Sequence, residues 1–322
     1  MPETIDGRIV TTMHDAPRTA VSRSPTVADS TPYAALHDAV LDWYTASARQ
    51  LPWRQPDAGA WAVLVSEFML QQTPVSRVLP AYAEWLNRWP TPAALAAEPA
   101  GEAVRAWGRL GYPRRALRLH AAATAIVERH GGVVPDDHAA LLALPGVGVY
   151  TAAAVASFAY GQRHAVVDTN VRRVFARAVD GVAHPSPSPT RRDLELAESL
   201  LPDDSATAAR WAVASMELGA LVCTSKTPKC RQCPISGRCA WVLVGRPAYD
   251  GPPRRGQTYD GTDRQARGRL LAVLRDATGP VSRHDLEQAW PDTVQRERAL
   301  DGLVSDGLVE PLTRNRFALP GS

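Results

Sequence analysis

LPGVGVYTAAAVASFAYG, residues 144–161, has the pattern of a tight turn between two helices. Gly146 and Gly148 allow such a turn and let backbone amides approach an anion such as a phosphate group. The amides at the start of the second helix favour an anion on the same side. Because glycines occur in many helix-to-helix turns, this motif alone predicts a helical hairpin and no particular function.

Alanine-rich segments with helical periodicity lie on both sides of this hairpin, and alternation of β-branched residues is scarce. The sequence therefore predicts an all-α fold, and 322 residues allow two or three domains. No apolar run reaches the roughly 18 residues that a membrane span needs. The polar N-terminus is not typical of a secretory signal. We therefore expect a soluble, cytoplasmic protein with no membrane partner.

The net charge is only +3, but basic residues gather in three stretches. One such cluster is typical of a solvated helix face, whereas three beside motifs favour contacts with phosphate groups. The clusters are Arg105, Arg109, Arg114, Arg115 and Arg118; Arg163, Arg172, Arg173 and Arg177; and Lys226, Lys229, Arg231 and Arg238.

All four cysteines of the chain lie in one short segment with the spacing C-x6-C-x2-C-x5-C. A reducing compartment disfavours disulfides. Zinc ribbons usually have two C-x2-C pairs, and this segment has one. Four thiolates in unequal loops also suit a [4Fe–4S] cluster. The spacing leaves zinc and iron–sulfur about equally favoured for Cys223, Cys230, Cys233 and Cys239.

Both ends of the chain differ in composition from the middle. Residues 1–30 are rich in Thr, Ser and Pro without periodicity, which predicts a disordered tail. Residues 244–263 have the composition of a linker. Residues 264–322 predict three helices followed by a two-stranded wing, a module similar to a winged helix; a helical cap is the alternative.

Six motifs in order resemble the helix-hairpin-helix DNA glycosylases of the endonuclease III and MutY superfamily. The Glu of the second motif and the Tyr of the fourth indicate the MutY adenine glycosylase branch. The motifs are LPWR (51–54), SEFMLQQT (66–73), LGY (110–112), LPGVGVYTA (144–152), VDTNVRR (167–173) and MELGALVCT (216–224).

This resemblance implies a helix-hairpin-helix glycosylase core of two helical lobes. One lobe would be a helical barrel formed by residues 61–165, including the hairpin. The other would combine residues 31–60 with 166–243 and hold a [4Fe–4S] cluster on the four cysteines.

Glu67 lies in the nearly continuous apolar run WAVLVSEFML, with no basic residue three or four positions away. Burial without an ion pair raises a carboxyl pKa, so this side chain could donate a proton at neutral pH. A partly exposed glutamate at a helix end is the alternative from this segment alone. The resemblance implies that Glu67 protonates adenine at N7.

Asp168 precedes a helical run and is typical of an N-cap. Bonds from several N–H groups would keep its pKa low, and an ionised carboxylate could stabilise a positively charged sugar. The resemblance implies that this is the essential Asp and that Asn170 orients the water or the sugar. Thr169 replaces the glycine of many relatives and could alter the turn.

Tyr150 occupies the position at which endonuclease III enzymes carry a Schiff-base lysine. The chain has two lysines, Lys226 and Lys229, and both lie among the cysteines. We therefore expect a monofunctional glycosylase that leaves the DNA strand intact. The resemblance implies that Tyr150 helps to position Asp168 and the sugar.

Further residues match family positions around the extruded base, although each is also typical of ordinary packing or surface pairing. Two departures from the family are Pro113, where many relatives have a second Tyr, and Val213, where many have Glu or Gln beside the adenine. Trp53, Arg54 and Leu70 match the adenine pocket, and Gln72 and Tyr112 match the wedge that fills the vacated stack.

The sequence thus predicts a monomeric adenine DNA glycosylase that acts at the nucleoid on duplex DNA with adenine opposite 8-oxoguanine or guanine. The segment after residue 263 is too short for the Nudix-like domain with which relatives recognise 8-oxoguanine. A thymine or other mismatch glycosylase on the same scaffold is one alternative, and Glu67 argues against it because thymine has no N7. A non-catalytic DNA-binding protein with a structural zinc is another.

Overall fold

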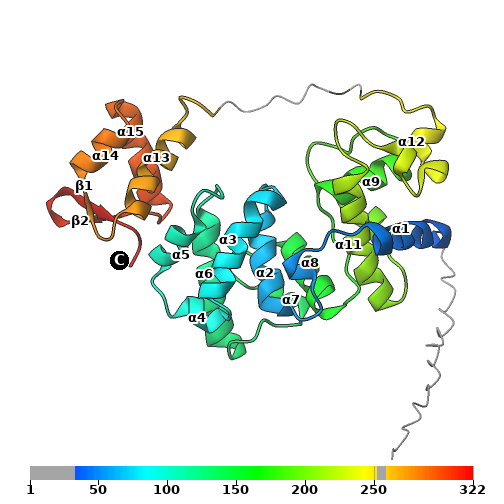
Figure 1. Ribbon diagram of the computed structural model, residues 1–322, viewed down its shortest axis with the longest axis horizontal. Coiled ribbons are helices and arrows are strands. Elements are labelled where there is room, and N and C mark those ends of the chain that lie inside the picture. The colour runs from blue at the N-terminus through cyan, green and yellow to red at the C-terminus, as the bar shows by residue number, and fades with distance from the viewer. Residues whose placement is uncertain (1–32, 250, 252–258, 322) are drawn as a thin grey trace, which may run out of the picture.

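The computed structural model describes residues 33–249, 251 and 259–321, and this part of the chain is mostly helical. The predicted all-α class of the core is confirmed. The predicted disordered tail and much of the predicted linker lie outside the described residues. Figure 1 shows two groups of helices side by side and a smaller module at the C-terminal end.

The first group of helices contains the predicted hairpin and is built around a tryptophan-rich core. Trp85 packs edge-to-face against Trp89 and Trp107, with ring centroids 4.6 and 5.6 Å apart. Gly131 and Gly161, which both have left-handed backbones, end the helices Arg114–His130 and Val149–Tyr160. The helices are α2 (Gly59–Leu70), α3 (Val75–Arg88), α4 (Pro92–Ala96), α5 (Ala100–Trp107), α6 (Arg114–His130), α7 (His138–Leu142) and α8 (Val149–Tyr160).

The second group combines the first described helix with helices from much later in the sequence. Helix α1 (Ala34–Ser47) packs against α11 (Ser205–Leu221), which also packs against α9 (Thr169–Ala178). Stacked rings of Phe175 and Trp211 lie in the core between α9 and α11. The chain thus passes from this group into the first through the short helix η1 (Pro52–Arg54) and later returns. Also in this group are α10 (Arg191–Ser199), η2 (Cys230–Gln232), η3 (Ser236–Arg238) and α12 (Ala240–Leu243).

The C-terminal module has three helices and a three-stranded antiparallel sheet in the order β1-β3-β2. The predicted three helices and paired wing strands are present, and classification as a winged helix stays a prediction. The elements are α13 (Asp263–Asp276), β1 (Val281–Ser282), α14 (Arg283–Ala289), α15 (Thr293–Ser305), β2 (Glu310–Leu312), η4 (Thr313–Asn315) and β3 (Arg316–Ala318).

The module is attached to the first group of helices by direct contacts. Arg105 on α5 donates to the backbone carbonyls of Arg275 and Ala277 at the end of α13, which carry the negative end of the helix dipole. Arg275 in turn donates to the carbonyl of Gly108, which follows α5. Within the described residues, no helix has the length and apolar character needed to cross a membrane.

Candidate active site

A cleft of about 2400 Å³, including its open mouth, lies between the two groups of helices. Helices α2 and α8 supply one wall, and α1, α11 and the start of α9 supply the other. Tyr112, Gly146 and Gly148 lie outside the lining. The structure brings together eight of the residues predicted from the sequence: Trp53, Arg54, Glu67, Leu70, Gln72, Tyr150, Asp168 and Asn170.

Glu67 lies in the last turns of α2 and is only 5% exposed. The pKa of its carboxyl is raised from 4.5 to about 7, chiefly by burial, and the charge of Asp168 contributes in the same direction. A hydrogen bond from Tyr150 and the charge of Arg54 act in the opposite direction. The predicted raised pKa is confirmed. A carboxyl with this pKa holds its proton in a substantial fraction of molecules at neutral pH and can release it to a leaving group.

Asp168 is the N-cap of α9, as predicted, and its Oδ1 accepts from the backbone N–H groups of Asn170 and Val171 at 2.8 and 2.7 Å. The prediction of a lowered pKa is wrong. Burial in the cleft raises the pKa of Asp168 above its ordinary value, and these hydrogen bonds offset the effect only in part. Helix α9 begins at Thr169 without a left-handed backbone, so the turn does not require glycine there, and an altered turn relative to the family stays a prediction.

Asn170 and Tyr150 hold the two carboxyl groups. The Asn170 amide donates to Oδ2 of Asp168 at 2.7 Å and accepts from Arg173 at 2.7 Å. The Tyr150 hydroxyl, in the first turn of α8, bonds to Glu67. Burial and the two carboxylates raise the pKa of Tyr150 well above its ordinary value, so the hydroxyl stays protonated. The predicted contacts of Asn170 with water or sugar stay predictions.

The cleft wall predicted to receive a base is partly aromatic and partly charged. Trp53 is buried with its ring edge-on to Tyr82, and Leu70 is half-buried at the end of α2. Arg54 lies 6.0 Å from the ring of Tyr44. An apolar pocket with a few fixed polar groups is the usual form of a small-ligand site.

Both predicted wedge residues have left-handed backbones, which are uncommon outside glycine. Gln72 has φ 55° and Tyr112 has φ 48°, and the Tyr112 side chain is 51% exposed. Arg115, which is buried, donates to the carbonyls of Gln71 and Gly111 and so connects the two loops. Strained and exposed residues held by a buried side chain are typical of a functional loop.

The two hairpin glycines differ in their physical requirements. Gly146 has φ 76°, and a Cβ there would lie 2.6 Å from the Cβ of Arg118. Gly148 has φ −102°, and a Cβ would meet no atom within 4 Å. The turn therefore requires glycine at 146, whereas neither the backbone nor the described neighbours require it at 148.

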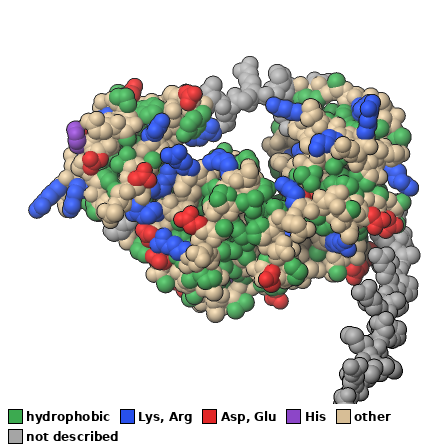
Figure 2. Space-filling view, viewed as in Figure 1, with side chains coloured by type: hydrophobic (Ala, Val, Ile, Leu, Met, Phe, Trp, Pro, Cys, Tyr) green, Lys and Arg blue, Asp and Glu red, His purple; other side chains and the backbone are tan. Residues whose placement is uncertain are grey.

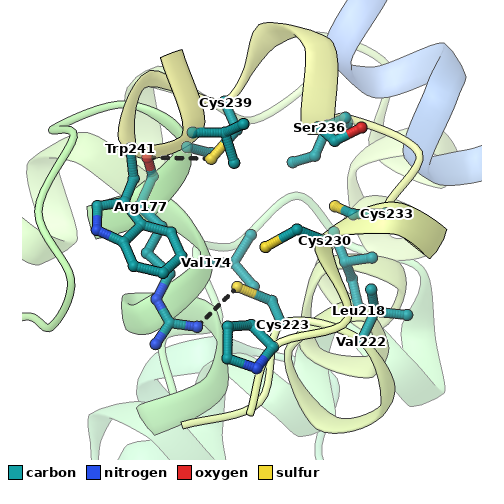
Figure 3. Close-up of a pocket in the computed structure, with 14 residues that line it drawn as sticks. Val174, Arg177, Leu218, Val222, Cys223, Cys230, Cys233, Ser236, Cys239 and Trp241 are labelled. Atoms are coloured by element: carbon teal, nitrogen blue, oxygen red, sulfur yellow. Dashed lines mark hydrogen bonds between the residues drawn. The ribbon is translucent and has the colours of Figure 1, made fainter. Parts of the chain in front are cut away.

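The four cysteines surround a pocket between α9, the end of α11 and the loops that follow (Figure 3). Arg177 donates from Nη1 to the Sγ of Cys223 at 3.3 Å. Burial raises the pKa of the Cys233 thiol to about 11, and the neighbouring cysteines add to this effect. Thiols so placed ionise only with a compensating positive charge, which a bound metal centre supplies.

The potential metal ligands that line this pocket are the four cysteines, without histidine, aspartate or glutamate. Among the described residues, no group of three or more Cys, His, Asp or Glu is already placed to hold a single ion. Four thiolates are a donor set that suits either a zinc ion or an iron–sulfur cluster.

Comparisons with known proteins agree with this geometry. Residues 65–199 match the HhH-GPD superfamily of base excision DNA repair proteins. An adenine DNA glycosylase of Mycobacterium tuberculosis strain H37Rv is 57% identical over 283 residues, which cover 88% of this chain and 92% of that protein. The chain belongs to the adenine DNA glycosylase family.

Two further comparisons support this family and its fold. An adenine DNA glycosylase of Mycolicibacterium smegmatis is 55% identical and is matched over 95% of its length and 88% of this chain. The solved structure of a thermostable thymine-DNA glycosylase is 28% identical with a TM-score of 0.58, covering 65% of this chain and 95% of that one.

The prediction that the three basic clusters contact phosphate groups is wrong for several of their arginines. Arg115, Arg172, Arg173 and Arg177 are buried and donate to protein carbonyls, so they stabilise the fold. Arg163 donates to the carbonyl of Pro202. Figure 2 shows other basic side chains around the hollow beside the C-terminal module. The exposed basic residues of the predicted clusters include Arg109, Arg114, Arg118, Lys226, Lys229, Arg231 and Arg238.

Sequence reasoning missed a buried ion cluster at the edge of the cleft. Glu217 on α11 is 0% exposed and accepts hydrogen bonds from Arg49 and Arg54. Val213, one turn earlier on α11, lines the cleft where many family members carry a polar residue. The only signal in the sequence was a charged residue inside the apolar run AVASMELGALV.

Proposed function

We propose that the protein hydrolyses the N-glycosidic bond of adenine opposite 8-oxoguanine or guanine in duplex DNA and leaves the strand intact. The observation that carries this proposal is the pair of carboxyl groups in one cleft. Glu67 and Asp168 line the same cleft, and the charge of Asp168 acts on Glu67, which supports a role for both groups on one nucleotide. They also differ in hydrogen bonding, because Asp168 accepts three N–H bonds and Glu67 accepts one from a tyrosine hydroxyl.

This difference suits an acid and an electrostatic stabiliser. Glu67 would donate its proton to a ring nitrogen of adenine, so that the base leaves as a neutral molecule. Positive charge then develops on the sugar, and the carboxylate of Asp168 would stabilise it. Water adds to the anomeric carbon as the bond to the base breaks, and its released proton restores the acid. Tyr150 would keep Glu67 oriented throughout.

The absence of lysine from the catalytic hairpin supports strand-preserving chemistry. A lyase of this superfamily forms a Schiff base through an amine, and the lysines of this sequence, Lys226 and Lys229, both lie in the cysteine loops. Tyr150 occupies the corresponding place and is bonded to Glu67. We therefore propose that the product is an intact strand with an abasic site.

We further propose that Cys223, Cys230, Cys233 and Cys239 hold a [4Fe–4S] cluster. The support is the all-cysteine donor set around one pocket, together with the spacing of these cysteines in the sequence. Exposed basic residues decorate the loops between these cysteines, so the cluster would fix a surface suited to phosphate groups. The proposed hydrolysis needs no electron transfer. A monomer acting on chromosomal DNA in the cytoplasm remains part of this proposal.

A duplex with adenine opposite 8-oxoguanine, labelled on the adenine strand, tests the proposal. We expect strand breaks only after alkali treatment, and none with Glu67→Gln or Asp168→Asn, which should still bind the duplex. Breaks without alkali would contradict the strand-preserving chemistry. Release of thymine from a G·T duplex in place of adenine would favour the alternative substrate, and no release from either duplex would favour a non-catalytic binding protein. Iron and sulfide analysis of the purified protein tests the cluster against zinc.

A further inference from the structure

Glu217 forms the centre of a buried ion cluster beside the proposed catalytic cleft. Its Oε1 accepts from the backbone N–H and Nε of Arg49 at 3.1 and 2.7 Å, and its Oε2 accepts from Nη2 of Arg49 at 2.6 Å. Nη2 of Arg54 adds a fourth bond to Oε2 at 3.0 Å. These bonds hold the pKa of the Glu217 carboxyl at about 2, so it is ionised at neutral pH despite burial.

Among the described residues, only one of the two terminal nitrogens of the Arg54 guanidinium has a hydrogen-bond partner. Its Nη2 bonds to Glu217, whereas its Nη1 is buried and has no hydrogen-bond partner among the described residues. Arg54 lines the cleft together with Glu67, and its positive charge acts on both Glu67 and Tyr150. A buried donor without a partner costs about 1–3 kcal/mol, so the single bond to Glu217 is the main constraint on this guanidinium.

The groups around Glu67 show with which side chain Arg54 could pair if its bond to Glu217 were lost. The charged groups that act on Glu67 are Asp168 at the start of α9 and Arg54 on η1, and the Tyr150 hydroxyl faces it from α8. From α6, Arg115 contacts the carbonyls at the end of α2 and not the Glu67 carboxyl. Besides Glu217, Glu67 is the carboxyl in this cleft on which the charge of Arg54 acts, so it is the partner we expect if Glu217 loses its charge.

We propose that Glu217 is a positioning residue that holds Arg54 at the cleft and prevents this guanidinium from pairing with Glu67. The consequence for catalysis rests on the proposed function. Arg49 bonds to both oxygens of the Glu217 carboxylate and thereby fixes its orientation. In this orientation the carboxylate also accepts the bond from Arg54. The general acid therefore depends on a carboxylate that itself makes no contact with the leaving base.

The consequence for catalysis follows from the proton on Glu67. Pairing with Arg54 favours the ionised form and lowers the pKa of Glu67. Above its pKa, each unit of decrease reduces the neutral fraction about tenfold. Glu217→Gln should therefore reduce the excision rate at pH 8 by about tenfold or more, and much less at pH 6. A purely structural defect would lower the rate at both pH values alike.

The decisive measurement is the titration of the Glu67 carboxyl in the free full-length protein. Glutamate labelled with 13C at the side-chain carboxyl gives a signal for each residue, and its loss in Glu67→Gln identifies the signal of Glu67. We expect Glu217→Gln to lower the Glu67 pKa and Arg54→Met to raise it. In the Arg54→Met background, Glu217→Gln should have no further effect. Glu195→Gln, on exposed α10, is the matched control and should change nothing.

Each outcome decides the inference. A Glu67 pKa that is unchanged or raised in Glu217→Gln overturns it, as does an equal effect of Glu217→Gln with and without Arg54. If Glu217→Gln does not fold, Glu217→Asp serves instead, because the shorter side chain keeps the charge but cannot reach both arginines. The titration needs no substrate, so a wild-type protein that fails to release adenine would reject the proposed function and leave this test intact.

Discussion

Replacing Glu67 by glutamine should stabilise the protein at alkaline pH, although the side chain is a proposed catalytic acid. The folded protein keeps this carboxyl 5% exposed and raises its pKa from 4.5 to about 7. A raised pKa means that the folded state binds the proton more tightly than the unfolded state. The stability from this group is therefore complete below about pH 4.5 and is lost as pH rises through 7.

The size of the effect follows from the two pKa values. Between pH 5 and pH 8 the wild-type protein should lose about 2.5 kcal/mol of unfolding free energy through Glu67 alone. Glutamine has no proton to lose, so the variant should lose none by this route. The packing is nearly unchanged, because glutamine has almost the same shape and can still bond to Tyr150.

Urea unfolding followed by circular dichroism at pH 5 and pH 8 measures this difference. The quantity of interest is the stability of Glu67→Gln minus that of the wild type at each pH, since other ionisable groups cancel. Glu195→Gln, in an exposed pair with Arg191, provides the control. If the difference is the same within about 0.5 kcal/mol at both pH values, Glu67 ionises at its ordinary pKa. The proposed acid would then lack its proton at neutral pH.

Tyr150→Phe removes a hydrogen bond that favours ionised Glu67, so the Glu67 pKa should rise. The alkaline limb of the pH–rate profile should then move to higher pH in single-turnover assays, and a shift to lower pH would contradict this. Gly146→Ala should weaken duplex binding about tenfold or more at constant salt, and Gly148→Ala less than about twofold, because only the first meets a left-handed backbone and a steric clash. Equal losses in a binding titration would refute that distinction. Arg115→Lys should lose about 2–4 kcal/mol in urea unfolding, because an amine cannot replace bonds to both wedge loops; an unchanged midpoint would refute this.

Local patterns predicted much of the fold. The hairpin of residues 144–161, the N-cap at Asp168 and the paired wing strands depend on neighbours within a few residues. The raised pKa of Glu67 was also predictable, because its surroundings on α2 are apolar. These features share one physical basis: the groups that determine them are close together in the sequence.

What the sequence could not provide is the burial caused by distant segments. Hydrogen bonds to Asp168 come from Asn170 and Val171, two and three residues later, but the burial that raises its pKa comes from the whole cleft. Arg173 and Arg177 lie on α9 at positions typical of a basic surface, yet they contact carbonyls about 46 residues later. A buried arginine that satisfies carbonyls has no periodic pattern of its own.

Val213 replaces a polar residue of many family members, and the pairing of nearby Glu217 with distant arginines affects how this replacement is interpreted. The sequence indicates a lost polar contact with the base at this point of α11. The structure places a carboxylate one helical turn later, at Glu217, and commits it to arginines 163 and 168 residues away in the chain. Arg54, which lines the cleft, is thereby held in place by a side chain of α11 in the second group of helices. Removal of Glu217 should therefore disturb the cleft more than any substitution of Val213 by another apolar residue.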